Sequence, residues 1–188
     1  MFFYRIAFIL FLLINFSYAN DLLKYEQKSK SAIKELSISL QKSLKSVLKE
    51  SGPIVAIEYC NIAALAITSD TSNFNKISIK RTSLKLRNKS NKPDKWEIDV
   101  LNSFEKRKNS GEEISTLNYQ NIYTENNEIF YRYMKAIPTV KACLTCHGSN
   151  RNPKVVIKLS ELYPDDSAYN YVIGEIRGAF SVKIPISN

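Results

Sequence analysis

A five-residue pattern in the C-terminal third of the chain constrains its fold more than any other feature. Cys143 and Cys146 are separated by two residues, and His147 follows directly. Two thiols at this spacing can bond to the two vinyl groups of one porphyrin, and the adjacent imidazole can then bind its iron. The pattern therefore predicts one covalently attached c-type haem, with Cys143 and Cys146 as attachment points and His147 as an iron ligand.

Three other chemistries fit two cysteines at this spacing. A thioredoxin-type redox pair requires a βαβ context, which the residues around Cys143 do not show. A structural zinc site would need a Cys₃His set: Cys60, Cys143, Cys146 and His147. Such a set is disfavoured because adjacent residues such as Cys146 and His147 rarely bind one ion. A plain disulfide would leave His147 without a role.

Residues 1–19 have the pattern of a secretory signal peptide. Arg5 precedes an apolar run over 6–14, and the segment ends in the small-residue stretch 17–19. The run is far shorter than the roughly 20 residues of a membrane-spanning helix, and we expect no later stretch to span a membrane. The mature protein should begin near Asn20, after cleavage at Ala19, and should be periplasmic. An uncleaved signal anchor is the alternative.

The length and charge of the mature chain restrict its class further. Residues 20–188 match the length of one domain. The full chain has 27 Lys and Arg against 18 Asp and Glu, a formal net charge of +9. Most of this charge is expected on a solvated surface, although it would also favour an anionic partner or a membrane surface. Nucleic acid is not an expected partner because an exported protein seldom meets it and no aromatic-basic recognition motif occurs.

Two helices are predicted at the start of the mature chain. Apolar residues recur at helical spacing over about 21–50, and Gly52-Pro53 would end this helix and begin another over about 53–68. The first helix is expected to pack on the core, with dimerisation as the alternative. One face of the second helix carries six apolar residues: Ala56, Ile57, Cys60, Ala63, Ala64 and Ile67. Small alanines around Cys60 would let a porphyrin approach, although a lone cysteine is usually a small buried residue.

The chain offers few ligands for the sixth position of the iron. His147 is the only histidine, and Met134 is the only methionine after Met1. Haem bound by two histidines is therefore impossible within one chain. Cys60, Met134, a tyrosine, water or no ligand remain. Met134 lies in an alternating, strand-like run over 130–137, where a core position is expected.

The segment 77–97 is rich in cations. Arg81 and Arg87 are candidates for binding the haem propionates, because a guanidinium group suits a carboxylate, and solvated surface is the alternative. A third helix is predicted from Asp94 to about residue 111, because Asp94 and Glu97 have the spacing of a capping box.

The rest of the chain is predicted to be mainly strands. Strands over 114–123 and 129–137 should form a hairpin around the turn 125–128. A short helix over 154–162 and a final strand over 176–186 follow. Helices that precede antiparallel strands indicate an α+β domain.

Four stretches resemble the Tll-like family of periplasmic haem-c sensor domains. They are Cys60 with its Ala-rich helix, RTSLKLRN with the following Pro93-Asp94 and Trp96-Glu97, CLTCHG, and YPDDSAYNYVIGEIRGAFSV. The resemblance covers most of the mature chain. It implies a PAS-like antiparallel sheet with long N-terminal helices packed against it. It also implies that His147 and Cys60 are the two axial ligands of the haem iron.

These ligands lead to an expected function. A thiolate opposite His147 would favour Fe(III) and a low reduction potential. We expect a redox or gas sensor in which Cys60 is an exchangeable iron ligand that a diatomic gas can replace. Its expected partner is a redox partner or a membrane signalling protein. The protein could also form a homodimer. The alternative is an electron-transfer cytochrome that keeps both ligands. A haem enzyme is not expected, because no second histidine could serve as acid or base.

Overall fold

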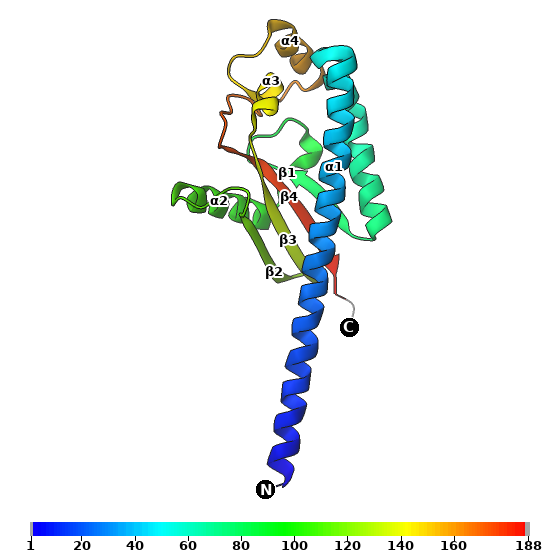
Figure 1. The fold of residues 1–188 in the computed structure, drawn as a ribbon, viewed down its shortest axis with the longest axis vertical. Helices are drawn as coiled ribbons and strands as arrows, with labels where there is room; N and C mark the ends of the chain where they lie inside the picture. The colour runs from blue at the N-terminus through cyan, green and yellow to red at the C-terminus, as the bar shows by residue number, and fades with distance from the viewer. Residues whose placement is uncertain (1, 187–188) are drawn as a thin grey trace.

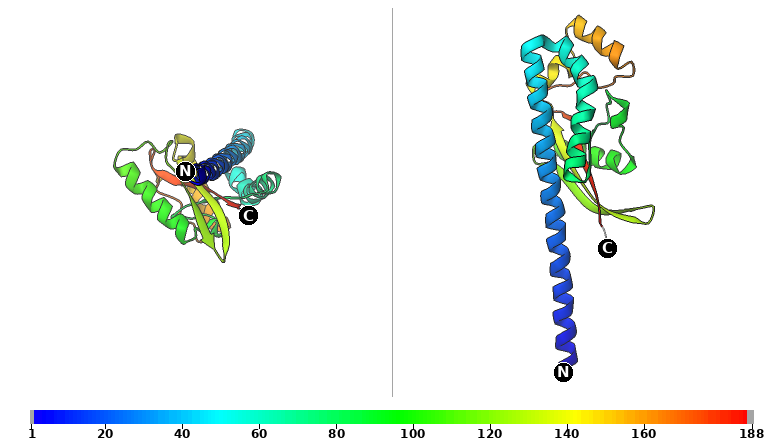
Figure 2. Two further views of the ribbon diagram at one scale, coloured as in Figure 1. Left: turned by 90° about the horizontal axis from the view of Figure 1, so that it is seen from below. Right: turned by 90° about the vertical axis from the view of Figure 1, so that its right-hand side faces the viewer.

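The computed structural model describes the backbone of residues 2–186 and the side chains of residues 21–186. Its centre is a four-stranded antiparallel sheet with the strand order β1-β4-β3-β2. A helical hairpin covers one face of this sheet, and a single helix lies against the other (Figures 1 and 2). The expected α+β class, with N-terminal helices packed against an antiparallel sheet, is confirmed.

Helix α1, Phe2–Asn75, consists of two arms that fold back on each other at Gly52. Gly52 has φ 78° and ψ −177°, a region that essentially only glycine enters. Pro53 then begins the second arm, where its missing N–H leaves no hydrogen bond unmade. The predicted break is confirmed, but the second arm continues to Asn75, past the predicted end near residue 68.

The first arm of α1 extends far beyond the sheet toward the N-terminus (Figure 1). The predicted signal peptide, residues 1–19, lies outside the residues whose side chains are described, so its cleavage stays a prediction. Among the described residues, the helix over 21–75 is long and apolar enough to cross a membrane by length and composition. This differs from the expectation for the mature chain. Ala56 and Ile57 in this stretch are nevertheless buried against the domain.

The sheet contains strands β1 (Ser78–Thr82), β2 (Asn118–Glu125), β3 (Glu128–Pro138) and β4 (Ile176–Pro185). The predicted β2–β3 hairpin is confirmed, and Asn126 and Asn127 at its turn have positive φ values of 51° and 63°. Strand β2 begins at residue 118 and not at 114. Strand β1 was not predicted, because Lys80 and Arg81 interrupt its apolar alternation. It forms by pairing with β4, which places Arg81 opposite Phe180.

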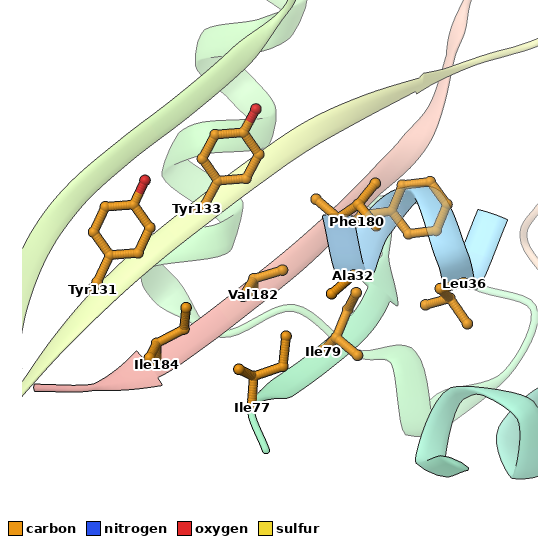
Figure 3. Packing of buried hydrophobic residues seen from close by; sticks show 10 residues of the cluster. Ala32, Leu36, Ile77, Ile79, Tyr131, Tyr133, Phe180, Val182 and Ile184 are labelled. Atoms are coloured by element: carbon orange, nitrogen blue, oxygen red, sulfur yellow. The ribbon is translucent and has the colours of Figure 1, made fainter. Parts of the chain in front are cut away.

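Side chains of β3 alternate between two cores. Tyr131 and Tyr133 face α1, and Met134 faces α2 (Lys95–Asn109). The core beneath α1, shown in Figure 3, contains Ala32, Ile33, Leu36, Ile77, Ile79, Tyr131, Tyr133, Phe180, Val182 and Ile184. The core beneath α2 contains Trp96, Val100, Leu101, Phe104, Ile114, Leu117, Met134, Ala136, Ile176 and Ala179. Met134 is fully buried, so its predicted core position is confirmed.

The start of α2 confirms the predicted capping box. The Glu97 backbone N–H donates to Asp94 Oδ1 at 2.8 Å, and the Asp94 N–H donates to Glu97 Oε2 at 2.9 Å. A short 3₁₀ turn, η1 (Lys89–Asn91), precedes this helix.

The remaining short helices lie beside the bend of α1 (Figure 1). They are η2 (Lys141–Cys143), α3 (Leu144–His147) and α4 (Pro153–Leu162). Val155 and Leu159 of α4 pack on Ile57 of the second arm, and Lys158 Nζ lies 3.0 Å from Glu58 Oε1. Four half-buried residues complete this third cluster: Ile54, Cys146, Leu162 and Tyr163. The C-x-x-C-H motif is thereby held against the helical hairpin.

Candidate functional site

The C-x-x-C-H motif folds as the two consecutive turns η2 and α3. Cys143 and Cys146 are half-buried, and both thiols are free, as is that of Cys60. The disulfide considered from the sequence is therefore not formed. The Cys₃His zinc set is not assembled either, since residues 21–186 contain no group of three or more His, Cys, Asp and Glu placed to hold a metal ion.

His147 is held in one orientation by the segment that precedes β4. Its Nδ1 lies 2.7 Å from the carbonyl oxygen of Ala168. Because a carbonyl oxygen can only accept, Nδ1 carries the hydrogen. Burial and the charges of Arg177 and Arg87 lower the pKa of His147 to about 2. The ring is therefore neutral with a lone pair on Nε2, the form in which a histidine binds a metal while its other nitrogen is anchored.

Arg87 connects the motif to the same segment. Its Nη2 donates to the Cys146 carbonyl at 2.6 Å and to the Ala168 carbonyl at 3.2 Å. Its Nε donates to Asp166 Oδ2 at 3.2 Å, and its Nη1 lies 3.4 Å from His147 Nε2. Three contacts of Arg87 thus go to protein acceptors. Its predicted contact with a propionate remains a prediction.

Two stretches that carry the family resemblance lie side by side here. The backbone N–H of Ser167 donates to the Leu86 carbonyl at 2.7 Å, and the Leu86 N–H donates to Ser167 Oγ at 2.8 Å. RTSLKLRN and YPDDSA therefore meet next to His147, although they are far apart in the sequence. Local patterns could not reveal this pairing.

Cys60 approaches the motif from the second arm of α1. Ala56 and Ile57 are buried, and the other four residues of the predicted face are half-buried, while Tyr59 and Ile62 are exposed. Ile57, one turn before Cys60, packs in the cluster that includes Cys146. Burial raises the pKa of the Cys60 thiol, and the charges of Arg81 and Arg87 oppose this rise. Cys60 and His147 thus lie at the same end of the molecule, while Met134 lies beneath α2.

Two arginines that the sequence analysis did not single out also border the motif. Arg177 Nε lies 3.5 Å from His147 Nε2, and Arg177 Nη1 lies 3.3 Å from Ser83 Oγ. The Arg151 guanidinium lies over the Tyr169 ring, 4.9 Å from its centroid. The alternation of the last strand predicts that Arg177 points away from the core, and Arg151 follows the motif in a polar loop. Neither position gave a sequence signal for a role in the site.

The site has polar groups that suit an anionic cofactor. The Nε atoms of Arg81 and Arg151 are buried and have no hydrogen-bond partner among the described residues. Buried donors usually have an acceptor, and haem carries two carboxylates. Two free thiols on consecutive turns, a neutral His147 and these unsatisfied donors therefore fit a covalently bound haem.

Comparisons with known proteins identify the family and the fold that this chain shares. A family model described as Tll0287-like matches residues 19–185. The crystal structure of the cyanobacterial heme-protein Tll0287 has a TM-score of 0.64 and 24% sequence identity to this chain. The match covers 86% of this chain and 95% of that chain, and it shows a shared fold. No curated protein matches the chain.

Proposed function

This chain belongs to the Tll0287-like family, and we propose that it is an exported monohaem c-type cytochrome that acts as a redox or gas sensor. The main observation behind this proposal is the arrangement of the C-x-x-C-H motif. Cys143 and Cys146 present free thiols on consecutive turns, and His147 is fixed through Nδ1, which leaves Nε2 as the nitrogen for the iron. Arg177 Nε and Arg87 Nη1, 3.5 and 3.4 Å from Nε2, would give way to the iron there. The description of Tll0287 as a heme-protein supports the same cofactor.

Each candidate residue has a role in this proposal. Cys143 and Cys146 form the two thioethers, and His147 and Cys60 are the axial ligands. Arg81 and Arg87 are the candidates for the propionates. When bound, haem supplies one-electron chemistry and an iron position that a diatomic gas can occupy.

The exchangeable ligand is Cys60, because it belongs to a different element from the covalent anchor. Residues 143–147 are fixed by Arg87 and the Ala168 carbonyl. Cys60 instead lies on an arm of α1 that contacts α4 and continues along the sheet. Loss of Cys60 from the iron would therefore change the packing of a helix, and not that of the motif itself.

Exposed apolar side chains on the second arm support a protein partner. Five large apolar side chains are exposed on this arm: Val55, Tyr59, Ile62, Leu65 and Phe74. Exposed apolar patches commonly mark interaction sites. A membrane signalling protein, a redox partner or a second copy of the chain are the candidate partners.

Covalent haem and export can be tested together. The chain is produced in a host with a cytochrome c maturation system, and the periplasmic protein is stained for haem on a denaturing gel. The expected result is a stained band whose intact mass corresponds to one haem and a chain beginning at Asn20. The Cys143→Ala/Cys146→Ala variant is the control and should not stain. A stained protein that retains Met1 would instead indicate a signal anchor.

An electron carrier is the second candidate function. It is favoured by the positive charge of the chain, +9 in full and +8 without Arg5 of the predicted signal peptide (26 Lys and Arg against 18 Asp and Glu), which would suit an acidic redox partner. Optical spectra of the ferric and ferrous protein, with and without carbon monoxide, separate the two. A sensor with an exchangeable ligand should bind carbon monoxide in the ferrous state. A carrier should keep both ligands in both oxidation states.

A further inference from the structure

The arginines with described side chains divide into two groups. The first group forms ion pairs with carboxylates: Arg87, Arg107 and Arg132. The second group has no ion pair with any side chain in the described part of the protein: Arg81, Arg151 and Arg177. These three arginines are half-buried, and arginine seldom leaves water without a partner, so the second group needs an explanation.

All three unpaired arginines surround the candidate site. Arg177 Nε lies 3.5 Å from His147 Nε2. Arg151 lies over the ring of Tyr169, which directly follows Ala168, the residue whose carbonyl holds His147. Arg81 is on β1, two residues before Ser83, whose hydroxyl accepts from Arg177. These arginines come from β1, from the loop after α3 and from β4. The fold therefore brings three cations from separate elements to the candidate site around His147.

This arrangement is unfavourable without an anion. The Nε atoms of Arg81 and Arg151 are buried without an acceptor. Arg177 donates to the Ser83 hydroxyl at 3.3 Å and to His147 Nε2 at 3.5 Å, and neither of these groups is an anion. A buried charge is strongly destabilising unless an opposite charge or hydrogen bonds compensate it.

We propose that Arg81, Arg151 and Arg177 bind the two propionate carboxylates of the haem, an inference that rests on the proposed function. A guanidinium presents paired N–H donors that match the two oxygens of a carboxylate. Arg87 differs from this group, since Asp166 and two carbonyl oxygens already accept from it. Its contacts hold the motif, so Arg151 and Arg177 take the place of Arg87 as propionate ligands beside Arg81.

The test uses the haem-loaded protein and the variants Arg81→Gln, Arg151→Gln and Arg177→Gln. Arg107→Gln is the matched control, because Arg107 lies on α2 and is paired with Glu112. The readouts are the resonance Raman bands of propionate bending and the midpoint potential. Each of the three variants should shift a propionate band and lower the potential, because a lost positive charge favours Fe(III). The control should leave both unchanged.

Conservative variants guard against misfolding. Arg→Lys at the same three positions keeps the charge but loses the paired donors. Compared with the glutamine variants, the lysine variants should therefore restore the native midpoint potential more fully than the native propionate band. The inference would be overturned if the propionate bands were unshifted in all three glutamine variants. It would also be overturned if these variants changed the midpoint potential without shifting a propionate band. In both cases the haem would still stain on the gel. Failure of the native protein to stain would instead overturn the proposed function.

Discussion

Arg87 Nη2 and Asp166 Oδ2 lie 3.1 Å apart in an ion pair whose side chains are only 13% and 8% exposed. Both partners also contact Ala168. Arg87 donates to its carbonyl at 3.2 Å, and Asp166 Oδ1 accepts from its N–H at 2.8 Å. Because the same carbonyl accepts from His147 Nδ1, this ion pair positions the group that orients the imidazole.

Replacing Asp166 with asparagine should therefore affect both stability and the iron. Asp166→Asn leaves the Arg87 charge buried and unpaired, which should cost about 3 kcal/mol of unfolding free energy. The midpoint potential should also shift, since the carbonyl that orients His147 is less firmly held. Urea unfolding and potentiometry measure the two effects.

The neighbouring acid provides the control for this prediction. Asp165 pairs with Lys89 at the surface, where the two side chains are 62% and 78% exposed. Asp165→Asn should change stability by about 0.5 kcal/mol or less, as expected for an exposed pair. Equal effects of the two variants would show that burial of the Arg87 pair does not matter.

A second prediction concerns the bend of α1. Gly52 has a backbone conformation that L-residues adopt only under strain, with φ 78° and ψ −177°. Gly52→Ala should therefore lower the free energy of unfolding by about 1–3 kcal/mol. The exposed neighbour Ser51 serves as control, because Ser51→Ala keeps a helical residue helical. If Gly52→Ala and Ser51→Ala unfolded at similar urea midpoints, the backbone at position 52 would not be strained by an L-residue.

Much of the fold follows from local patterns. The break at Gly52-Pro53, the capping box of Asp94 and Glu97, the β2–β3 turn and the alternation of β4 each lie within a few residues of sequence. Strand β1 could not be found in this way. Lys80 and Arg81 interrupt its apolar pattern, and it becomes a strand only because β4 pairs with it.

The candidate site likewise contains residues that a local sequence pattern identifies and residues that only folding brings together. Cys143, Cys146 and His147 form the C-x-x-C-H pattern by their spacing alone, so the sequence was sufficient to name them as candidates. The contacts of Arg87 with Asp166 and Ala168 join segments about 80 residues apart. Arg177 sits in a strand whose alternation predicts an outward side chain. Only the folded chain brings it to His147.

A third prediction uses pH and Asp94. Burial raises the pKa of Asp94, but hydrogen bonds from Arg132 and the Glu97 backbone, with nearby positive charges, lower it below its ordinary value overall. A carboxyl whose pKa is lower in the folded state stabilises the protein above its unfolded pKa, near 4. That contribution is lost as the pH falls through the folded pKa.

Asp94→Asn should therefore be destabilising mainly near neutral pH. It keeps a good N-cap residue but loses the charge, and because Asp94 is half exposed the loss should be about 1 kcal/mol at pH 7. At pH 2 the native protein and the variant should unfold at closely similar urea concentrations, followed by far-ultraviolet circular dichroism. Asp99→Asn, on the exposed side of α2, is the control. If the difference in urea midpoint between the native protein and Asp94→Asn persisted at pH 2, the pKa of Asp94 would not be lowered on folding as described.

The last prediction separates the two candidates for the sixth iron ligand. Cys60 lies on the second arm of α1, at the end of the molecule that holds the C-x-x-C-H motif. Met134 is fully buried in the core beneath α2, on the opposite face of the sheet. Since His147 is the only histidine, the choice between a thiolate and a thioether decides the spectrum.

Ligation by the Cys60 thiolate would give the ferric protein a sulfur-to-iron charge-transfer band and a low potential. Cys60→Ala should abolish that band, raise the midpoint potential and open the iron to added imidazole, because a negative ligand that favours Fe(III) is lost. Met134→Leu nearly conserves volume, so it should cost less than about 1.5 kcal/mol and leave the spectrum unchanged. If the Met134 variant loses the sixth ligand while the Cys60 variant keeps a native spectrum, the protein is a His/Met electron carrier, because Cys60 would then be only a small residue of the helix face.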